Sequence, residues 1–284
     1  MIVLFKNTIK LVSLFLLLLL SFIYTDKVFN EARSNDPLMK EVISYKRVHD
    51  VKPVEPKIKD DEMILGMSGL IINKEKSYKN MKEDDSFNKQ KLVYDKTKPN
   101  TSIDKTYDYY ITNGISKNMV SMIFKVNNST NVSELLSILA KTDVTVNFFI
   151  DGSYLEKNVE TAFSMVNLNS EIYNLGYDNE YSKKMISVTN NLIESITLKD
   201  SLFCLNNTKN DNYKDICASK KMLTLSPKLV NPSITDLKKD LSKGVMIVYD
   251  LDEFDTSKFN FIINVIESRG YKIKGLSKLI NENS

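Results

Sequence analysis

From residue 119 to the C-terminus, short apolar runs alternate with longer segments whose apolar residues recur every three or four positions. The short runs have the length of buried strands, and the longer segments have the spacing of amphipathic helices. Strands are expected at 120–126, 144–150, 171–175, 202–205, 222–225 and 245–249, helices at 132–142, 159–166, 182–196, 234–241 and 258–269, and a last strand and helix between 271 and 280. This alternation predicts a mainly parallel α/β fold, a distorted (β/α) barrel of about seven units with its working face at the carboxyl ends of the strands.

The N-terminus carries an uninterrupted, mostly apolar run at residues 11–24, preceded by two lysines. A run of this length fits a signal peptide and, with tilt, can span a bilayer. Residues 22–25 are too bulky for a small-residue cleavage site. We therefore expect residues 1–25 to be an uncleaved signal anchor that crosses the cell membrane once through residues 9–24, with the bulk of the chain outside the cytoplasm.

The middle of the chain has a weaker pattern. Residues 26–62 are charged and lack sustained periodicity, which predicts an extended stalk, although a helix could form over 37–47 with Asp36 as its cap. Residues 63–117 hold short apolar runs and predict a small accessory region. The main domain is therefore expected over residues 118–284.

Composition limits the possible functions. With 42% apolar residues, the 284-residue chain can build a sizeable core, and a net charge of only +3 argues against a nucleic-acid surface. The chain has a single histidine, His49, so a zinc site of cysteine and histidine is nearly excluded. Cys204 and Cys217 could form a disulfide or stay reduced and buried. Tryptophan is absent, so tyrosines would have to supply any stacking on sugar rings.

The segment 143–179 carries a family signal. Val146–Ile150 followed by Gly152, and then Ser170–Asn179, resemble the core of the polysaccharide deacetylases of the NodB-homology group, carbohydrate esterase family 4. In that family a strand ending in Thr-Phe-Phe leads to a glycine, and a second strand ends in Gly-His-Glu-Ile-Gly-Asn-His-x-x-x-His. The resemblance continues through 269–280, covers roughly residues 119–281, and implies the distorted barrel of that family.

The same resemblance implies a catalytic site whose residues this chain has replaced. The family holds a divalent metal with one aspartate and two histidines, and a second aspartate acts as the base. Here the base position holds Lys125, the metal-binding aspartate position holds Val126, and the two histidine positions hold Leu175 and Asn179. A cation and two apolar side chains cannot bind a hard divalent ion. The resemblance thus implies a degenerate member without a metal cofactor.

An acidic cluster offers an alternative site. Asp250, Asp252, Glu253 and Asp255 follow a predicted strand, where a barrel places its working face. Four carboxylates so close together could bind Ca²⁺ or Mg²⁺. A solvated acidic loop is the interpretation that we favour.

A third group of side chains could line a glycan cleft. The group comprises Asp151, Asn174, Tyr177, Asp178 and Tyr249. Asp151 and Asp178 are more simply explained as turn or cap residues, and Asn174 as part of the turn geometry of the motif. The family's late Leu-x-His motif would place its histidine opposite either Tyr249 or Asp250.

Three functional hypotheses follow. The first is a membrane-anchored, extracytoplasmic deacetylase-like protein that has lost hydrolysis and binds cell-wall polysaccharide or a wall-processing partner. The second is an active, metal-dependent deacetylase of N-acetylated wall glycan that uses the acidic cluster and loses activity in Asp250→Asn. The third is a purely structural partner in an envelope complex.

Overall fold

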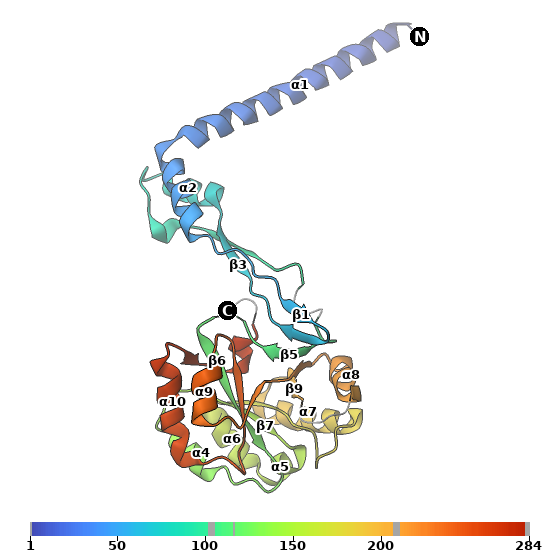
Figure 1. Ribbon diagram of the computed structural model, residues 1–284. Helices are drawn as coiled ribbons and strands as arrows, with labels where there is room; N and C mark the ends of the chain where they lie inside the picture. Colours follow the sequence, from blue (N-terminus) through green and yellow to red (C-terminus); the bar gives the residue numbers. More distant parts are fainter. Residues whose placement is uncertain (1, 102–105, 116, 207–210, 282–284) are drawn as a thin grey trace. The chain divides into compact units, whose positions relative to one another are not determined.

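The computed structural model describes residues 2–101, 106–115, 117–206 and 211–281. The chain divides into two compact units, which we call the N-terminal unit and the barrel unit (Figure 1). The N-terminal unit comprises residues 1–52 and 69–97, and the barrel unit comprises residues 53–68 and 98–284.

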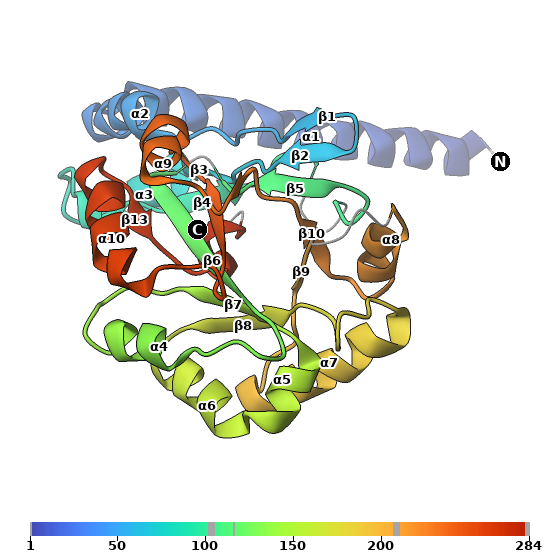
Figure 2. The same ribbon diagram turned by 60° about the horizontal axis from the view of Figure 1, so that its bottom comes forward.

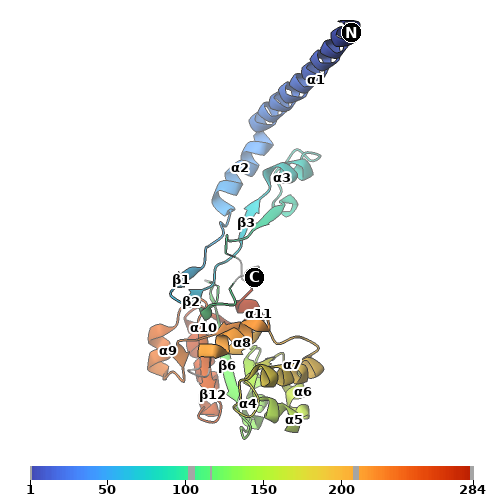
Figure 3. The same ribbon diagram turned by 90° about the vertical axis from the view of Figure 1, so that its right-hand side faces the viewer.

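The N-terminal unit consists of helices around a small two-stranded sheet. Its elements are α1 (Ile2–Asn35), α2 (Pro37–His49), β3 (Gly69–Ile72), α3 (Lys74–Met81), the 3₁₀ helix η1 (Lys89–Lys91) and β4 (Tyr94–Thr97). Strands β3 and β4 are antiparallel. Leu38 and Val42 of α2 pack against Ile72 and Met81, so α2 and α3 share a core of their own (Figure 3).

Helix α1 contains the apolar run. Its segment Val12–Asn35 includes an 18-residue window with a mean hydropathy of 1.8 and is the one helix of the described residues long and apolar enough to cross a membrane. A signal sequence passes the same test, so the membrane anchor predicted for residues 9–24 stays a prediction. The side chains of the lysines at positions 6 and 10 lie outside the described residues.

The extended stalk expected over residues 26–62 is instead helical as far as His49. Helix α2 begins where the sequence suggested, because Asp36 caps it: the Asp36 carboxylate accepts the backbone N–H of Leu38 at 2.9 Å, and Pro37 occupies the first turn. Tyr78 and Lys82 also donate to this carboxylate, each at 2.8 Å. Long-range partners therefore fix a helix that local propensity only weakly favours.

These bonds predict an unusual titration for Asp36. The bond from Lys82, followed by that from Tyr78, lowers the pKa of Asp36 to about 2. A lowered pKa means that the carboxylate stabilises the fold above the ordinary value of about 4 and that this contribution is lost as the pH falls from there towards 2. Carboxyl NMR of the full chain should show a midpoint near 2. Lys82→Met should raise that midpoint, and an unchanged midpoint would contradict the assignment.

The barrel unit is built on one curled, mixed sheet. Its strands are β1 (Lys57–Lys59), β2 (Glu62–Ile64), β5 (Tyr110–Asn113), β6 (Met119–Val126), β7 (Asn147–Ile150), β8 (Glu171–Asn174), β9 (Phe203–Leu205), β10 (Leu223–Leu225), β11 (Leu229–Val230), β12 (Met246–Asp250) and β13 (Lys272–Ile273). The order across the sheet is β1-β2-β5-β10-β9-β8-β7-β6-β12-β11, with β13 beside β6. Strand β1 is antiparallel to β2, and the other pairings are parallel.

Helices surround the curled sheet (Figure 2). They are α4 (Ser133–Leu139), α5 (Gly152–Lys157), α6 (Val159–Asn167), α7 (Lys183–Thr197), α8 (Asp211–Ser219), α9 (Ile234–Asp240), the 3₁₀ helix η3 (Thr256–Lys258), α10 (Phe259–Ser268) and α11 (Leu276–Leu279). Within the described residues no strand ladder joins β5 to β12, so the sheet is a half-barrel. A Lys228–Glu62 ion pair at 2.7 Å and a bond from the Asn113 amide to the Lys243 carbonyl cross this gap.

Strand alternation divides the core of the barrel unit into two parts. Along β6, residues Val120, Met122, Phe124 and Val126 belong to the outer core, beneath the helices. Met119 and Ile123 instead join the inner core, enclosed by the sheet. Successive side chains of a strand point to opposite faces, so this register decides which residues near the strand ends face the barrel mouth.

A disulfide attaches α8 to the sheet. Cys204 of β9 and Cys217 of α8 are bonded, and both are fully buried with Ile186, Tyr213 and Met222 around them. This structure therefore answers the question that the sequence left open.

The predicted domain boundaries differ from the observed units. The accessory region expected over 63–117 is shared: β3, α3 and β4 belong to the N-terminal unit, whereas β2 and β5 are strands of the barrel sheet. Strand β2 pairs in parallel with β5, some 48 positions later (Glu62 opposite Tyr110). A contact over such a separation leaves no local periodicity, so the pattern of the sequence does not reveal it.

Candidate functional site

The barrel mouth lies at the carboxyl ends of β6, β7, β8 and β12, where parallel strands present their last residues together. Lys125 of β6 and Asp250 of β12 are directly opposite in the strand register. Their neighbours Phe124 and Tyr249 are in the outer core, so alternation turns Lys125 and Asp250 towards the mouth. Asp250 rather than Tyr249 thus occupies the mouth-facing position of the late motif.

Lys125 and Asp250 form an ion pair. The Lys125 Nζ lies 2.7 Å from the Asp250 Oδ2, and the two side chains are only 15% and 18% exposed. The Asn127 amide donates to Asp250 Oδ1 at 3.5 Å and to Asp252 Oδ2 at 3.3 Å, while the side-chain Oδ1 of Asn231 accepts the backbone N–H of Asp250. The carboxylate that the alternative hypothesis needs as a ligand or base is therefore held by a cation and an amide.

This ion pair should couple the two residues energetically. We expect Lys125→Met or Asp250→Leu alone to lower the free energy of unfolding by about 1–3 kcal/mol, because each leaves a mostly buried charge unpaired. The double variant should cost less than the sum by about 1 kcal/mol, measured by urea unfolding. The exposed pair Lys228–Glu62, also 2.7 Å apart, is the matched control and should show almost no coupling. Strict additivity at Lys125 and Asp250 would contradict the assignment.

The other replaced family positions do not offer ligands to a metal. Val126 packs in the outer core and Leu175 in the inner core, each almost fully buried. Asn179 is exposed on the loop after β8 and has a left-handed backbone with φ 60°. Among the described residues, no group of three His, Cys, Asp or Glu side chains is placed to hold a metal ion. The residues present therefore do not fit the divalent metal that the family resemblance implies.

Asp151 organises the loop that carries Asn179. Its carboxylate, in a residue that is 3% exposed, accepts the backbone N–H and the hydroxyl of Ser153 at the start of α5. It also accepts the backbone N–H groups of Asp178 at 3.0 Å and Asn179 at 3.2 Å. Asp178 and Asn179 both have positive φ, which lets consecutive N–H groups converge on one carboxylate. Asp151 therefore acts as a cap and a loop anchor, the simpler explanation that the sequence suggested.

The structure does not bring the predicted glycan cleft together. Asn174 is fully buried, and its side chain bonds the Ile186 carbonyl and the Gly176 N–H. Tyr249 is 4% exposed and lies on the opposite face of the sheet from the mouth. With Asp151 buried as well, only Tyr177 and Asp178 of the predicted cleft reach the surface beside the mouth. The Tyr177 hydroxyl donates to Glu156 at 2.6 Å.

The rest of the acidic cluster serves local roles. Asp255 caps η3, and its bonds from Ser257 and Lys258 lower the pKa of this carboxyl. Glu253 accepts the Asn231 amide at 3.1 Å. These contacts support the solvated acidic loop over a metal site.

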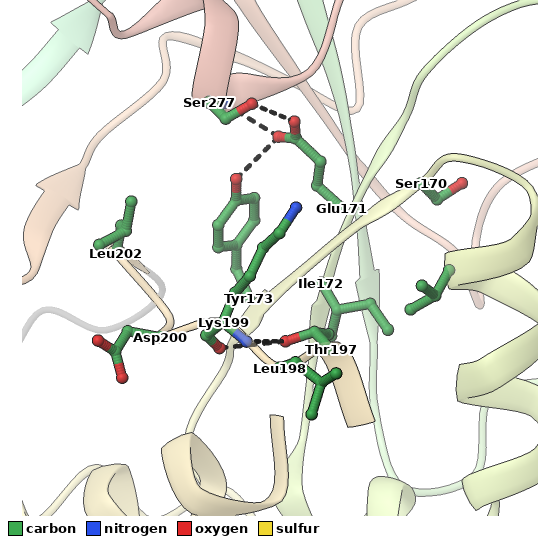
Figure 4. Close-up of a pocket in the computed structure, with 11 residues that line it drawn as sticks. Ser170, Glu171, Ile172, Tyr173, Thr197, Leu198, Lys199, Asp200, Leu202 and Ser277 are labelled. Atoms are coloured by element: carbon green, nitrogen blue, oxygen red, sulfur yellow. Dashed lines mark hydrogen bonds between the residues drawn. The ribbon is translucent and has the colours of Figure 1, made fainter. Parts of the chain in front are cut away.

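A cavity of about 440 Å³ lies at the other end of the strands, around the start of β8 (Figure 4). In it the Glu171 carboxylate accepts the Tyr173 hydroxyl at 2.8 Å and both the N–H and the hydroxyl of Ser277. A Cβ on Gly275 would collide with that carboxylate, so glycine makes room for it. Glu171 thus connects β8 to α11, and the cavity lies away from the mouth where the family resemblance places chemistry.

Comparison with solved structures identifies the architecture. A mutant of BA3943, a CE4 family pseudoenzyme with restored enzymatic activity, matches with a TM-score of 0.69 and 20% identity over 87% of this chain and 98% of that chain. The chain has the fold of carbohydrate esterase family 4 (CE4). Wild-type BA3943 from Bacillus anthracis matches with a TM-score of 0.68 and 20% identity, over 88% of this chain and 96% of that chain. PdaA of Bacillus subtilis, a family 4 carbohydrate esterase, matches with a TM-score of 0.52 and 14% identity, over 62% and 86%.

The extent of these matches differs. The barrel unit leaves out residues 1–52 and 69–97, more than a quarter of the chain, so the BA3943 match must extend into the N-terminal unit. Among curated proteins, the uncharacterized protein YlxY of Bacillus subtilis (strain 168) is 27% identical over 274 residues, covering 88% of this chain and 85% of YlxY. No family model matches the sequence. The fold is thus shared with BA3943, a CE4 family pseudoenzyme, over most of both chains.

Proposed function

We propose that this chain is a membrane-anchored, extracytoplasmic CE4-fold protein that does not hydrolyse acetamides and that binds N-acetylated wall glycan at the barrel mouth. The observation that carries the loss of hydrolysis is the Lys125–Asp250 ion pair. By the family resemblance, the base position holds an aspartate and the late motif holds a histidine. Here a cation and a carboxylate occupy these positions and neutralise each other, so neither is available to move a proton.

The comparisons support the same proposal. BA3943 is a CE4 family pseudoenzyme, and its match covers more of this chain than that of PdaA. The buried Val126 and Leu175 would each need replacement before a metal could be held. A CE4-fold protein that does not hydrolyse its ligand can still bind a sugar polymer at the barrel mouth, because binding and catalysis are separable.

Two features support a location outside the cytoplasm. The Cys204–Cys217 disulfide is of a kind that persists in oxidising compartments and is rare in the cytosol. Helix α1 is long and apolar enough to serve as an anchor. Both features support the part of this proposal that puts the barrel unit outside the cytoplasm, where wall glycan is accessible.

Glycan binding is tested with the full chain in detergent. Co-sedimentation with insoluble chitin and with peptidoglycan should retain the protein. Tyr177→Ala, at the mouth, should weaken retention at least tenfold, about 1.4 kcal/mol. Tyr94→Ala removes a more exposed tyrosine from the N-terminal unit and should leave retention unchanged. Absence of retention, with a protein captured from membrane lysate instead, would favour an envelope protein as the partner and refute glycan binding.

The rival hypothesis, an active deacetylase built on the acidic cluster, predicts acetate release that Asp250→Asn abolishes. The pairing of Asp250 with Lys125 and of Asp255 with Lys258 argues against it. Assay of acetate release from chitin oligomers in the same preparations separates the two hypotheses directly.

A further inference from the structure

The cavity around the start of β8 is lined by two opposite charges that are not paired with each other. Its volume is about 440 Å³, and Glu171 and Lys199 are both among its lining residues. Neither side chain forms an ion pair with any residue that the structure describes. Figure 4 shows the Lys199 side chain extending with its ammonium group towards the side of the cavity that holds Glu171. The cavity therefore presents a carboxylate and an ammonium group that a ligand can reach.

The Glu171 carboxylate is held in place by neutral donors. It accepts the Tyr173 hydroxyl at 2.8 Å and the backbone N–H of Ser277 at 3.0 Å. Burial, followed by the charge of Glu171, raises the pKa of Tyr173 well above its ordinary value, so this hydroxyl remains a donor. Neutral donors orient a carboxylate without cancelling its charge. A cationic group that enters the cavity therefore meets an acceptor that is already oriented.

Lys199 is positioned by the turn that ends α7. The Leu198 N–H donates to the Glu194 carbonyl at 2.8 Å, and the Lys199 N–H donates to the Thr197 hydroxyl at 3.2 Å. These bonds hold the backbone of Lys199 and leave its ammonium group without a partner in the described part of the chain. A carboxylate in the cavity would supply the missing charge-assisted bond.

Two leucines give the cavity an exposed apolar rim. Leu198 is 88% exposed and Leu202 is 51% exposed, and both line the cavity. Leu198 also has a left-handed backbone with φ 56°, at the end of a helix where glycine is favoured. The chain thus keeps an apolar side chain in water at a position that suits a residue without one. A ligand with an apolar group would cover this surface.

The arrangement of charges limits the ligand. A simple amine or a simple carboxylate would satisfy only one of Glu171 and Lys199, and a peptide carries its terminal charges far apart. Asp200 adds a second carboxylate to the lining, which disfavours a ligand that is only an anion. An ammonium group and a carboxylate on one carbon, next to an apolar side chain, match the charged pair and the leucine rim together.

We infer that this cavity binds a free α-amino acid with an apolar side chain. Its ammonium group pairs with Glu171, its carboxylate with Lys199, and its side chain covers Leu198 and Leu202. The site lies at the amino ends of the strands, away from the barrel mouth, and does not rest on the proposed function.

The ligand class is tested by NMR titration of the full chain in detergent with leucine, N-acetylleucine, leucinamide and glycine. Leucine should cause saturable shifts at residues 171–173 and 197–202 with a dissociation constant of about 1 mM. N-acetylleucine lacks the ammonium group, leucinamide lacks the carboxylate, and glycine lacks the apolar side chain. Each of these three should bind at least tenfold more weakly than leucine.

Two variants test the residues. Lys199→Met keeps the aliphatic stem of an exposed residue and removes its charge, so it should fold normally and weaken leucine binding at least tenfold. Leu198→Gly suits the left-handed turn and removes the rim side chain, so it should keep or raise stability and still weaken binding. Lys141→Met is the matched control, because Lys141 is an exposed lysine outside the cavity, and it should bind leucine like wild type.

Three results would overturn the inference. They are leucine binding that survives Lys199→Met, equal binding of N-acetylleucine or leucinamide, and the absence of any saturable shift with leucine. Tyr177→Ala at the mouth should leave the leucine shifts unchanged, which separates this result from the test of the proposed function.

Discussion

Replacing both Cys204 and Cys217 with serine is expected to lower the free energy of unfolding by about 3 kcal/mol, the value that loop-closure entropy gives for a bridge of this span. The two residues are 13 positions apart. The bridge is a covalent cross-link between α8 and β9, so the loss should appear first at these two elements. Urea unfolding gives the free energy, and amide hydrogen exchange locates the loss.

The controls separate the bridge from packing. Wild type treated with reductant should fall to the stability of the double serine variant, while the oxidised protein should resist mild reductant because both sulfurs are fully buried. A stability unchanged by the double substitution would contradict a structural role for the bridge.

Asp151→Ala is expected to lower the free energy of unfolding by about 2–3 kcal/mol, because it leaves two buried donors of Ser153 and two partly buried backbone N–H groups without their acceptor, and a lost buried acceptor costs about 1 kcal/mol or more. The carboxylate accepts bonds from Ser153, Asp178 and Asn179. Without it, the left-handed pair Asp178 and Asn179 loses the contact that holds it. Exchange of the loop amides should therefore accelerate more than that of β7.

Asp236 supplies the matched control. Like Asp151, it accepts from a serine at the start of a helix, but it is exposed. Asp236→Ala should therefore cost about 0.5–1 kcal/mol. Asp151→Asn, which keeps the shape and loses the charge, should fall between the two. Equal effects at Asp151 and Asp236 would contradict the loop-anchoring role.

The regular elements of the barrel unit follow from local pattern. The apolar period of three to four residues over 182–196 predicts a helix that the structure places at Lys183–Thr197, and the run over 245–249 predicts β12. The helix buries one continuous face and the strand is buried on both faces, so the first shows a helical period of apolar residues and the second a continuous apolar run. The CE4 fold was predicted from a different signal, the resemblance of residues 143–179 to the motifs of that family.

The elements and contacts that the sequence pattern did not predict depend on partners far away along the chain. Short strands such as β1 and β11 have no face long enough to show a period, and α2 gains its stability from Tyr78 and Lys82. At the site, sequence spacing could list Lys125 and Asp250 but could not show that they are register neighbours. The opposite charges at two strand ends of a parallel sheet were the signal that could have suggested the pair.

The second source of error was the face of the sheet towards which each side chain points. Tyr249 and Asp250 are adjacent in sequence, yet one is in the outer core and the other faces the mouth. Strand alternation separates such neighbours as soon as the register of a single strand is known. The predicted glycan cleft mixed both faces, which explains why three of its five members are buried.

The central claim is that this CE4 fold lacks hydrolysis because its metal and acid–base positions are occupied by Lys125, Asp250 and apolar side chains. The most direct test is calorimetric titration of the full chain with Zn²⁺, Co²⁺ and Mg²⁺, with acetate release from chitin oligomers and peptidoglycan followed in parallel and PdaA as the positive control. We predict neither stoichiometric metal binding nor acetate release by this chain. Tight metal binding with turnover that Asp250→Asn abolishes would contradict the claim and establish a working site in the acidic cluster.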